Sequence, residues 1–444
     1  MSASEPSAGK QKHGIFQRFL HSQVAGSVVL LACTILALIW ANSPAGDSYR
    51  ELTHTYVGVS FGEHSFKLSL QHWINDLLMA VFFFVVGLEI KREMVLGELS
   101  SFRKAILPVT AAVGGMVVPA AIYLMFNIGG KGGAGWGIPM ATDIAFALGI
   151  LAIFGKRVPL GLKVFLTALA IADDMGAVLV IALFYTEQVS LKALIVAGVF
   201  LLLLLVASRA NVRRVGVWAF LLIAVWLAVF ASGVHATVAG ILVAMVVPVR
   251  ARMDPHKFVE TVEANWRKLD MSKLTQESMV SNNDQYEALR TIDLAATDML
   301  PPGLVLERYL HVGQAFLILP LFAFFNAGVK IGGDYLELLS NPISLGIILG
   351  LVLGKQIGVF LFSWLAIKTG RAALPTGVSW GQMWGVSCLA GVGFTMSLFI
   401  SELAFEDPEL VSEAKIGILM ASLIAGVLGY LVLTRALPRL SLIH

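Results

Sequence analysis

Three aspartates, Asp143, Asp173 and Asp174, lie inside long apolar stretches of this chain. An aspartate at the centre of a membrane-spanning helix costs roughly 2.5–3.5 kcal/mol on insertion scales, so we expect none of the three to face lipid. Ionisable residues in such positions mark a site by default, where they pair with one another or line a water-filled cavity. Two of these carboxylates are adjacent and have only small or apolar neighbours. This combination predicts a site where a cation replaces protons.

The composition of the 444 residues is that of a polytopic membrane protein. Only 14% of the residues are charged and 57% are hydrophobic, whereas soluble domains carry about 25% charged residues. The two cysteines, Cys33 and Cys388, lie in apolar segments, which predicts packing roles and neither a disulfide nor a metal site. Residues 1–23 are polar, and the apolar run at 24–41 is longer than the apolar region of a signal peptide. We therefore expect a cytoplasmic N-terminal segment followed by an uncleaved first span.

Apolar windows of about 20 residues mark helices that cross a membrane. They predict twelve spans, at about 24–43, 70–90, 105–126, 135–155, 160–186, 191–208, 216–232, 234–250, 309–330, 343–367, 381–402 and 412–434. The expected fold class is an all-α membrane protein with a twelve-helix domain over residues 24–436.

Basic residues gather in every second connection between these spans, and the last of the other connections, 402–409, is acidic. Lysine and arginine are retained on the cytoplasmic side of a membrane, so both termini are expected there and the number of spans should be even. The basic residues are Lys91, Arg92, Arg103, Lys104, Lys156, Arg157, Lys163, Arg209, Arg213, Arg214, Arg250, Arg252, Lys257, Lys368, Arg371, Arg435 and Arg439.

Two connections are long enough to have structure of their own. The external loop 45–69 contains a pattern of strand, turn and strand at 57–68, which fits a β-hairpin with edges able to pair with another copy; an irregular loop fits equally well. The cytoplasmic insertion 251–308 is polar. Helical spacing of Phe258, Val262, Trp266 and Leu269 predicts an amphipathic helix there, either on the membrane surface or in a solvated linker.

Asp173 and Asp174 point about 100° apart if they lie on one helix. One carboxylate can then line a cavity while the other pairs with a base, and the available base is Lys355 in the middle of the tenth span. A buried lysine beside a carboxylate costs less than either group alone. Purely structural pairing of these polar groups is the competing interpretation.

Two predicted spans, the fourth and the eleventh, contain helix breakers near their middle. Gly137 and Pro139 precede Asp143 in one, and the sequence Gly-Val-Gly-Phe-Thr occupies 391–395 in the other. Broken helices in corresponding positions of two halves point to the site of a transporter, because freed backbone groups can line a cavity. If the breaks cross, helix N-termini would face Asp143, and Lys355 would offset the C-termini. The competing interpretation is that the glycines only allow close helix packing.

Several long motifs carry a resemblance to a known family. They are Ala-Thr-Asp-Ile-Ala-Phe-Ala-Leu-Gly (141–149), Ala-Leu-Ala-Ile-Ala-Asp-Asp-Met-Gly-Ala (168–177), Phe-Phe-Val-Val-Gly-Leu-Glu-Ile-Lys-Arg-Glu (83–93), Ser-Gly-Val-His-Ala-Thr (232–237) and Leu-Pro-Leu-Phe-Ala-Phe-Phe-Asn-Ala-Gly-Val (319–329). Over about residues 15–436 the chain resembles the NhaA-type bacterial sodium/proton antiporters. The resemblance implies inverted repeats formed by spans three to five and ten to twelve, with two crossing broken helices.

The resemblance also implies roles for individual residues. Asp174 matches the principal ion-binding aspartate, and Asp173 matches the neighbour that pairs with the lysine at Lys355, so Na+ is expected at the two aspartates and Lys355 is a charge partner or proton carrier. Thr142 and Asp143 match the polar pair at the crossing of the broken helices.

The resemblance further implies a set of residues for the response to pH. They are Glu89, Arg92, Glu93, His235, Glu307 and His311. Taken alone, the first three fit an ordinary charged helix end, and the histidine at 235 fits a structural role at a turn. The chain departs from the family pattern in its long insertion and in Arg308, where a second histidine is expected. Both changes fall in the region that the resemblance links to the pH response.

These observations predict a secondary active antiporter of the bacterial inner membrane that exports Na+ (or Li+) in exchange for H+, electrogenic and pH-regulated. One carboxylate site, visited alternately from both sides, couples the two fluxes. We expect no enzyme activity and no cofactor. The expected partners are Na+, H+, the lipid bilayer and a second copy of the chain in a homodimer, with no nucleic acid.

The main alternative is a sodium-coupled symporter of an organic solute on a related fold. It would need neutral polar groups around the breaks, and the candidates are Thr142, Asn326, Ser387, Thr395 and Ser397. An intramembrane aspartyl protease is disfavoured because the Gly-x-Gly-Asp context is missing, and a cation channel would avoid a strong buried pair of carboxylate and lysine.

Overall fold

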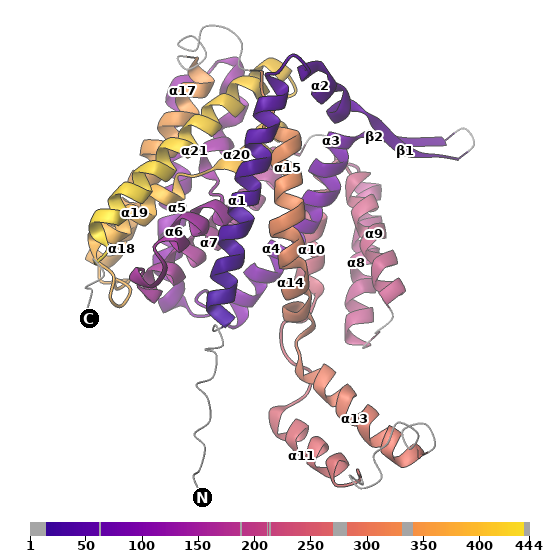
Figure 1. The fold of residues 1–444 in the computed structure, drawn as a ribbon. Helices are drawn as coiled ribbons and strands as arrows, with labels where there is room; N and C mark the ends of the chain where they lie inside the picture. Colours follow the sequence, from indigo (N-terminus) through magenta and orange to yellow (C-terminus); the bar gives the residue numbers. More distant parts are fainter. Residues whose placement is uncertain are drawn as a thin grey trace, which may run out of the picture. The chain divides into compact units, whose positions relative to one another are not determined.

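The structure is a computed structural model that describes residues 15–61, 64–186, 189–210, 212, 215–269, 282–330 and 341–438. Helices make up nearly all of it (Figure 1). Eight of the described helices are long and apolar enough to cross a membrane, and two bent helix pairs raise the number of candidate spans to ten. The chain is therefore a helical, multi-pass membrane protein.

The long candidate spans follow the apolar windows of the sequence. They are α1 (Ile15–Ala41), the continuous helix of α3 (Leu70–Trp73), η1 (Ile74–Leu78) and α4 (Met79–Val95), α5 (Phe102–Asn127), α7 (Leu160–Phe184), α8 (Leu191–Arg209), the helix of α14 (Pro302–Gly313), η5 (Gln314–Ile318) and α15 (Leu319–Asn326), the helix of α17 (Pro342–Leu349), η6 (Gly350–Gly354) and α18 (Lys355–Lys368), and α21 (Pro408–Ala436). The segments η1, η5 and η6 are single turns of π-helix inside these spans.

Two further spans are broken, which confirms the prediction from their glycine and proline residues. The 3₁₀-helix η2 (Lys131–Met140) and α6 (Ile144–Ile153) meet at a bend of 42°. The helices α19 (Trp380–Ala390) and α20 (Phe394–Ala404) meet at a bend of 41°. Both breaks leave backbone N–H and C=O groups outside the helical ladder, and these groups need other partners in an apolar environment.

The remaining two predicted spans are short in the structure. The windows at 216–232 and 234–250 form α9 (Val215–Phe230) and α10 (Thr237–Val246). At 1.5 Å per residue the 10-residue helix α10 is about 15 Å long, half of the roughly 30 Å hydrocarbon core of a bilayer. Length and composition alone therefore support eight to ten spans rather than the expected twelve.

The described contacts divide the chain into two compact units. Unit 1 comprises residues 1–71, 106–177 and 315–444, and unit 2 comprises residues 72–105 and 178–314. Within unit 1, α19 runs beside α21, and α1 packs against α6 and α15 (Figure 1).

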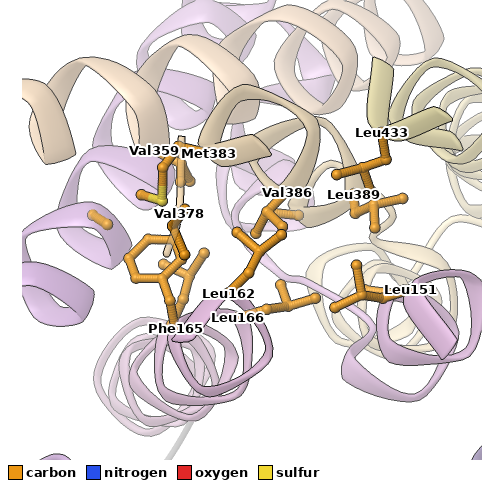
Figure 2. Packing of buried hydrophobic residues seen from close by; sticks show 14 of the residues in the cluster. Leu151, Leu162, Phe165, Leu166, Val359, Val378, Met383, Val386, Leu389 and Leu433 are labelled. Atoms are coloured by element: carbon orange, nitrogen blue, oxygen red, sulfur yellow. The ribbon is translucent and has the colours of Figure 1, made fainter. Parts of the chain in front are cut away.

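A buried hydrophobic cluster packs helices of unit 1 together (Figure 2). Its members come from α5, α6, α7, α18, α19 and α21 and include Leu151, Leu162, Leu166, Val386, Leu389 and Leu433. Truncating one such leucine to alanine typically costs about 2–5 kcal/mol, because the cavity collapses only in part. This cluster fixes the helices that carry the polar residues near the breaks.

Small residues let helices in both units approach closely. A Cβ added at Gly358 of α18 would lie 2.1 Å from the carbonyl oxygen of Gly114 in α5. In unit 2, a Cβ at Gly240 of α10 would lie 2.1 Å from the carbonyl oxygen of Ala80 in α4. Any side chain at these glycines would force the backbones apart. Two other helix pairs of unit 2 are also in contact, α8 with α9 and α14 with α4.

The insertion 251–308 contains two helices that pack side by side, α11 (Pro255–Trp266) and α13 (Asn283–Met299) (Figure 1). Asp254 and Asn282 cap their N-termini through side-chain oxygens. The helix α11 carries Phe258, Val262 and Trp266 of the predicted apolar face; Trp266 is 56% exposed, and Leu269 lies beyond the end of the helix. The second helix was not predicted, because Asn282 looks like a breaker when it is in fact an N-cap.

The loop 45–69 contains a helix and a β-hairpin. The helix α2 (Gly46–His54), which the sequence did not predict, precedes strands β1 (Tyr56–Phe61) and β2 (His64–Ser69). The strands are antiparallel, with Tyr56 opposite Ser69 and Phe61 opposite His64. The described strands are thus slightly longer than the sequence pattern.

Some sequence predictions fall outside the described residues. They concern residues 1–14 of the N-terminal segment, the hairpin turn at 62–63, residues 270–281 of the insertion, and the basic residues Arg213, Arg214 and Arg439. The short helix η3 (Gly155–Arg157) lies within the described part and follows α6.

Candidate functional site

The two helix breaks of unit 1 meet at Asp143. This residue is 2% exposed and caps α6, where its Oδ1 accepts the N–H of Phe146 (3.0 Å). Its Oδ2 accepts the N–H (3.2 Å) and the hydroxyl (2.5 Å) of Thr395, in the first turn of α20. The backbone N–H of Asp143 in turn donates to the carbonyl of Val392 (2.7 Å) in the other break. One carboxylate therefore faces the positive N-terminal ends of two half-helices.

Hydroxyl groups satisfy other backbone groups that the breaks set free. Ser422 of α21 accepts the N–H of Phe394 through its Oγ (3.0 Å). Ser397 donates to the carbonyl of Ile138 (2.8 Å). These bonds replace the missing helical ladder, because an unsatisfied backbone group in an apolar interior costs several kcal/mol.

Asp173 and Lys355 form an ion pair inside unit 1. Both side chains are fully buried, and the ammonium of Lys355 donates to Asp173 Oδ2 and to the carbonyl oxygen of Met140 at the end of η2. Lys355 thus binds both a carboxylate and the C-terminal end of a half-helix, where a positive charge is favourable. Among the described residues no hydrogen-bond donor reaches Asp173 Oδ1.

Thr142 connects this pair to the second broken helix. Its hydroxyl oxygen lies 2.6 Å from Asp173 Oδ2 and 2.8 Å from the carbonyl oxygen of Ala390, at the end of α19. A hydroxyl has one hydrogen, so it can donate to only one of these acceptors at a time. The arrangement can respond to a change of charge at Asp173 by rotation of one hydroxyl group.

Asp174 is adjacent on α7 and is 2% exposed. The helix turns about 100° per residue, so Asp174 faces a different part of unit 1 from Asp173. The structure brings together all the residues that the sequence proposes for ion binding: three buried carboxylates, one hydroxyl and one ammonium. The three carboxylates outnumber the single ammonium, and a carboxylate can hold either a proton or a hard cation.

No group of three or more His, Cys, Asp or Glu side chains within the described ranges is placed to hold a metal ion. A cation at Asp173 and Asp174 would therefore need further oxygen ligands. The hydroxyl of Thr142 and freed carbonyl groups at the breaks are of the oxygen type that hard cations prefer.

A second charged cluster lies in unit 2. Arg92 of α4 forms ion pairs with Glu307 of α14 and with Glu93 (3.3 Å). Glu93 also accepts the N–H of Glu98 (2.9 Å), which holds the turn after α4. Glu89 lies within electrostatic range of the same residues. The expected charged cluster is thus assembled from two helices.

The two histidines of the expected pH-response set have different surroundings. His311, one turn after Glu307 on α14, lies within electrostatic range of Arg92. His235 lies in the turn between α9 and α10, where its Nε2 donates to the carbonyl of Tyr185 (2.5 Å). The structure therefore places only His311 beside the cluster's arginine.

Sequence reasoning missed two residues of the breaks as structural partners. The sequence pattern places Thr395 at the second break and among the neutral groups for an organic solute, but it indicates no bond to Asp143 and gives Ser422 no role. The signal for Thr395 is its place directly after Gly-Val-Gly-Phe, in the first turn of the helix that follows the second break. Ser422 lies on a distant helix, so no local pattern indicates it.

Buried carboxylates and an ammonium at two broken membrane helices define a class of protein, the membrane transporters of small cations, and not an enzyme. The family model described as Na+/H+ antiporter 1 matches residues 17–433. The chain belongs to this family.

Similar proteins support this assignment over nearly the full length. A protein of Acidithiobacillus ferrooxidans named Na(+)/H(+) antiporter NhaA is 47% identical over 422 residues, which cover 94% of this chain and 96% of that protein. Proteins with the same name from Oleidesulfovibrio alaskensis (46% over 418 residues, 94% of this chain and 93% of that protein) and Bordetella bronchiseptica (45% over 434 residues, 98% and 99%) are also similar.

Proposed function

We propose that this chain is an electrogenic antiporter of the bacterial inner membrane that exports Na+ (or Li+) in exchange for H+. The observation that carries the proposal is the cluster of Asp143, Asp173, Asp174 and Lys355, all at most 2% exposed, where two broken helices meet. Carboxylates can hold either protons or a cation, so one such site visited from both sides couples the two fluxes.

We assign different roles to the three carboxylates. Asp143 accepts three hydrogen bonds at the N-termini of two half-helices, which supports a role in holding the breaks together. Asp174 and Asp173 bind the cation, with Thr142 as a further oxygen ligand. Lys355 pairs with Asp173 in the absence of the cation and is either the charge partner or the carrier of the second proton.

We propose twelve spans with both termini in the cytoplasm. The eight long helices, the two broken pairs and the two short apolar helices α9 and α10 together make twelve. An even number agrees with basic residues in every second connection. Spans three to five and ten to twelve then form inverted repeats, each containing one broken helix.

We propose that Glu89, Arg92, Glu93, Glu307 and His311 form the part of the protein that responds to pH, with His235 as a separate contributor. The ion pairs of Arg92 with Glu307 and Glu93 support this role, since they join α4 to α14 through charged groups. The hairpin of β1 and β2 has exposed strand edges suited to pairing with a second copy, and we propose a homodimer formed there.

The alternative of a symporter for an organic solute is less well supported. Its candidate neutral groups bind protein partners: Thr395 binds Asp143, Ser397 binds the Ile138 carbonyl, and Ser387 binds the Met383 carbonyl. A solute would have to displace these bonds, one of which, from Ser397 to the Ile138 carbonyl, joins the two broken helices.

Everted membrane vesicles test the proposed function. They are acidified inside by respiration, loaded with a pH-sensitive dye, and given NaCl or LiCl without any organic solute. An antiporter releases protons, and the response increases as pH rises because protons then compete less with the cation. Absence of proton release at every pH, with a response only after addition of an organic solute, would support the symporter instead.

A further inference from the structure

A second group of hydrogen-bonded polar side chains in unit 1 is centred on Glu402, eight residues beyond the start of α20. Glu402 accepts hydrogen bonds from Lys415 Nζ (2.5 Å) and from Gln71 Nε2 (3.4 Å). Gln71 Nε2 also lies 3.1 Å from Asn326 Oδ1, which accepts its second hydrogen. The four residues come from α20, α21, α3 and α15. We call them the Glu402 layer.

The Glu402 layer is largely shielded from solvent. The side chains of Lys415 and Glu402 are 10% and 20% exposed, and Asn326 is fully buried. Hydrogen bonds between charged groups in such surroundings are stronger than those at a protein surface. The layer therefore ties the ends of four helices together at one level of unit 1.

The same face of α20 connects this layer to the carboxylate site. Thr395 and Glu402 are seven residues apart, nearly two helical turns, so they lie on one face about 10 Å apart along the axis. Thr395 binds Asp143. Between them Phe399 packs edge-to-face on Phe322 of α15, with ring centroids 6.2 Å apart and both side chains at most 1% exposed.

Helix α15 has the matching arrangement. Phe322 and Asn326 are four residues apart and lie on one face. The aromatic pair of Phe322 and Phe399, which we call the aromatic layer, thus lies between Asp143 and the Glu402 layer along α15 and α20. An ion that moves along this face must separate both layers, and the aromatic layer alone offers a hydrated ion no polar partner.

We propose that the Glu402 layer is a latch that closes the carboxylate site toward the side of the membrane on which Glu402 lies. The strength of the latch then sets the balance between the state open toward that side and the state open toward the other side. The inference rests on the proposed antiport function. Opening toward this end breaks the bonds of Glu402 with Lys415 and Gln71, and closing restores them. The latch takes no part in ion binding.

The latch predicts an effect that depends on the side of the membrane. Apparent affinity scales with the fraction of protein in the state that accepts the ion. Weakening the latch raises the fraction open toward Glu402, so the half-saturating Na+ concentration should fall on that side and rise on the other, each about three- to tenfold. A substitution at a residue that merely stabilises the fold lowers the amount of protein in the membrane. It changes the half-saturating Na+ concentration, if at all, alike on the two sides.

Right-side-out and everted membrane vesicles expose the two faces in turn. The variants are Glu402→Gln, Lys415→Met and the exchange of the two charges, Glu402→Lys with Lys415→Glu. The matched control is Lys330→Met, which removes an ion pair with Asp47 in the same unit (3.2 Å) whose side chains are 53% and 84% exposed. We expect opposite shifts on the two faces for both single variants, recovery toward wild type in the exchanged pair, and no shift in the control.

Unchanged half-saturation on both faces, or equal shifts in the same direction, would overturn the latch while wild-type exchange stands. Absence of Na+/H+ exchange in the wild-type vesicles would instead defeat the proposed function. If Glu402→Gln does not accumulate in membranes, Gln71→Leu provides the test. It keeps the ion pair but cuts the layer from α3 and Asn326, and opposite shifts of smaller size are expected; their absence also overturns the latch.

Discussion

Asp143 accepts two hydrogen bonds from Thr395, one from the backbone N–H and one from the hydroxyl, although the residues are 252 positions apart. The same carboxylate caps α6 through the N–H of Phe146. Each helix N-terminus contributes about half a positive charge. Asp143 is therefore balanced by two half-helices, whereas Asp173 is balanced by Lys355.

The variant Thr395→Val tests the link between the two breaks. It removes the hydroxyl while keeping the shape and the backbone N–H. A hydrogen bond to a charged group contributes about 1.5–3 kcal/mol, and we expect the free energy of unfolding to fall by roughly that amount. Thermal melting of the purified protein in detergent measures it. Thr395→Ser, which keeps the hydroxyl, should melt close to wild type, and equal melting temperatures for the valine and serine variants would contradict the link.

The pair of Lys355 and Asp173 should stabilise the fold. Replacing Lys355 with alanine leaves a buried carboxylate uncompensated, which costs on the order of 3–5 kcal/mol when such a pair is broken. The double variant Asp173→Asn with Lys355→Gln removes both charges and should recover part of the loss. Melting temperatures of the wild type, the single variant and the double variant decide this. If the double variant is no more stable than Lys355→Ala, the pair is not structural.

Asp174→Asn should abolish exchange and leave the fold intact. The amide has the size of the carboxylate, but it neither attracts a cation by charge nor carries a proton at neutral pH. Sodium/proton exchange is measured in proteoliposomes, with melting temperature and monodispersity as checks on folding. Asp47→Asn is the matched control, because Asp47 lies in an exposed ion pair with Lys330. Wild-type exchange by the Asp174→Asn protein would remove Asp174 from the ion site.

Part of this structure could be predicted from the sequence because it depends on local patterns. Apolar windows located the long helices, and glycine and proline located both breaks. The pairing of Asp173 with Lys355 follows from the cost of burying either charge alone, and family resemblance pointed to the same residues.

The rest depends on contacts between distant segments. Whether Thr395 or Ser422 satisfies a freed backbone group is decided by which helices pack at the break, and no local pattern records that. The apolar stretch that forms α10 does not reveal that its helix has only 10 residues. Gln71, Glu402 and Lys415 look like ordinary polar residues at helix ends until the fold joins them.

We propose that one site exchanges a single Na+ for two protons, one from Asp174 and one from Asp173 or Lys355. The site loaded with protons then carries one more positive charge than the site loaded with sodium. Each cycle moves one net charge inward, worth about 2.3 kcal/mol per 100 mV of membrane potential. A negative interior should therefore drive sodium export without any pH gradient.

Proteoliposomes loaded with Na+, at equal pH on both sides, test the exchange of two protons for one Na+. A potassium gradient with valinomycin imposes an interior-negative potential, and sodium efflux is followed with and without it. Efflux that accelerates with the potential, and that is absent in the Asp174→Asn protein, is the predicted result. Efflux that ignores the imposed potential would mean exchange of one proton per sodium and would exclude Asp173 and Lys355 from the proton count.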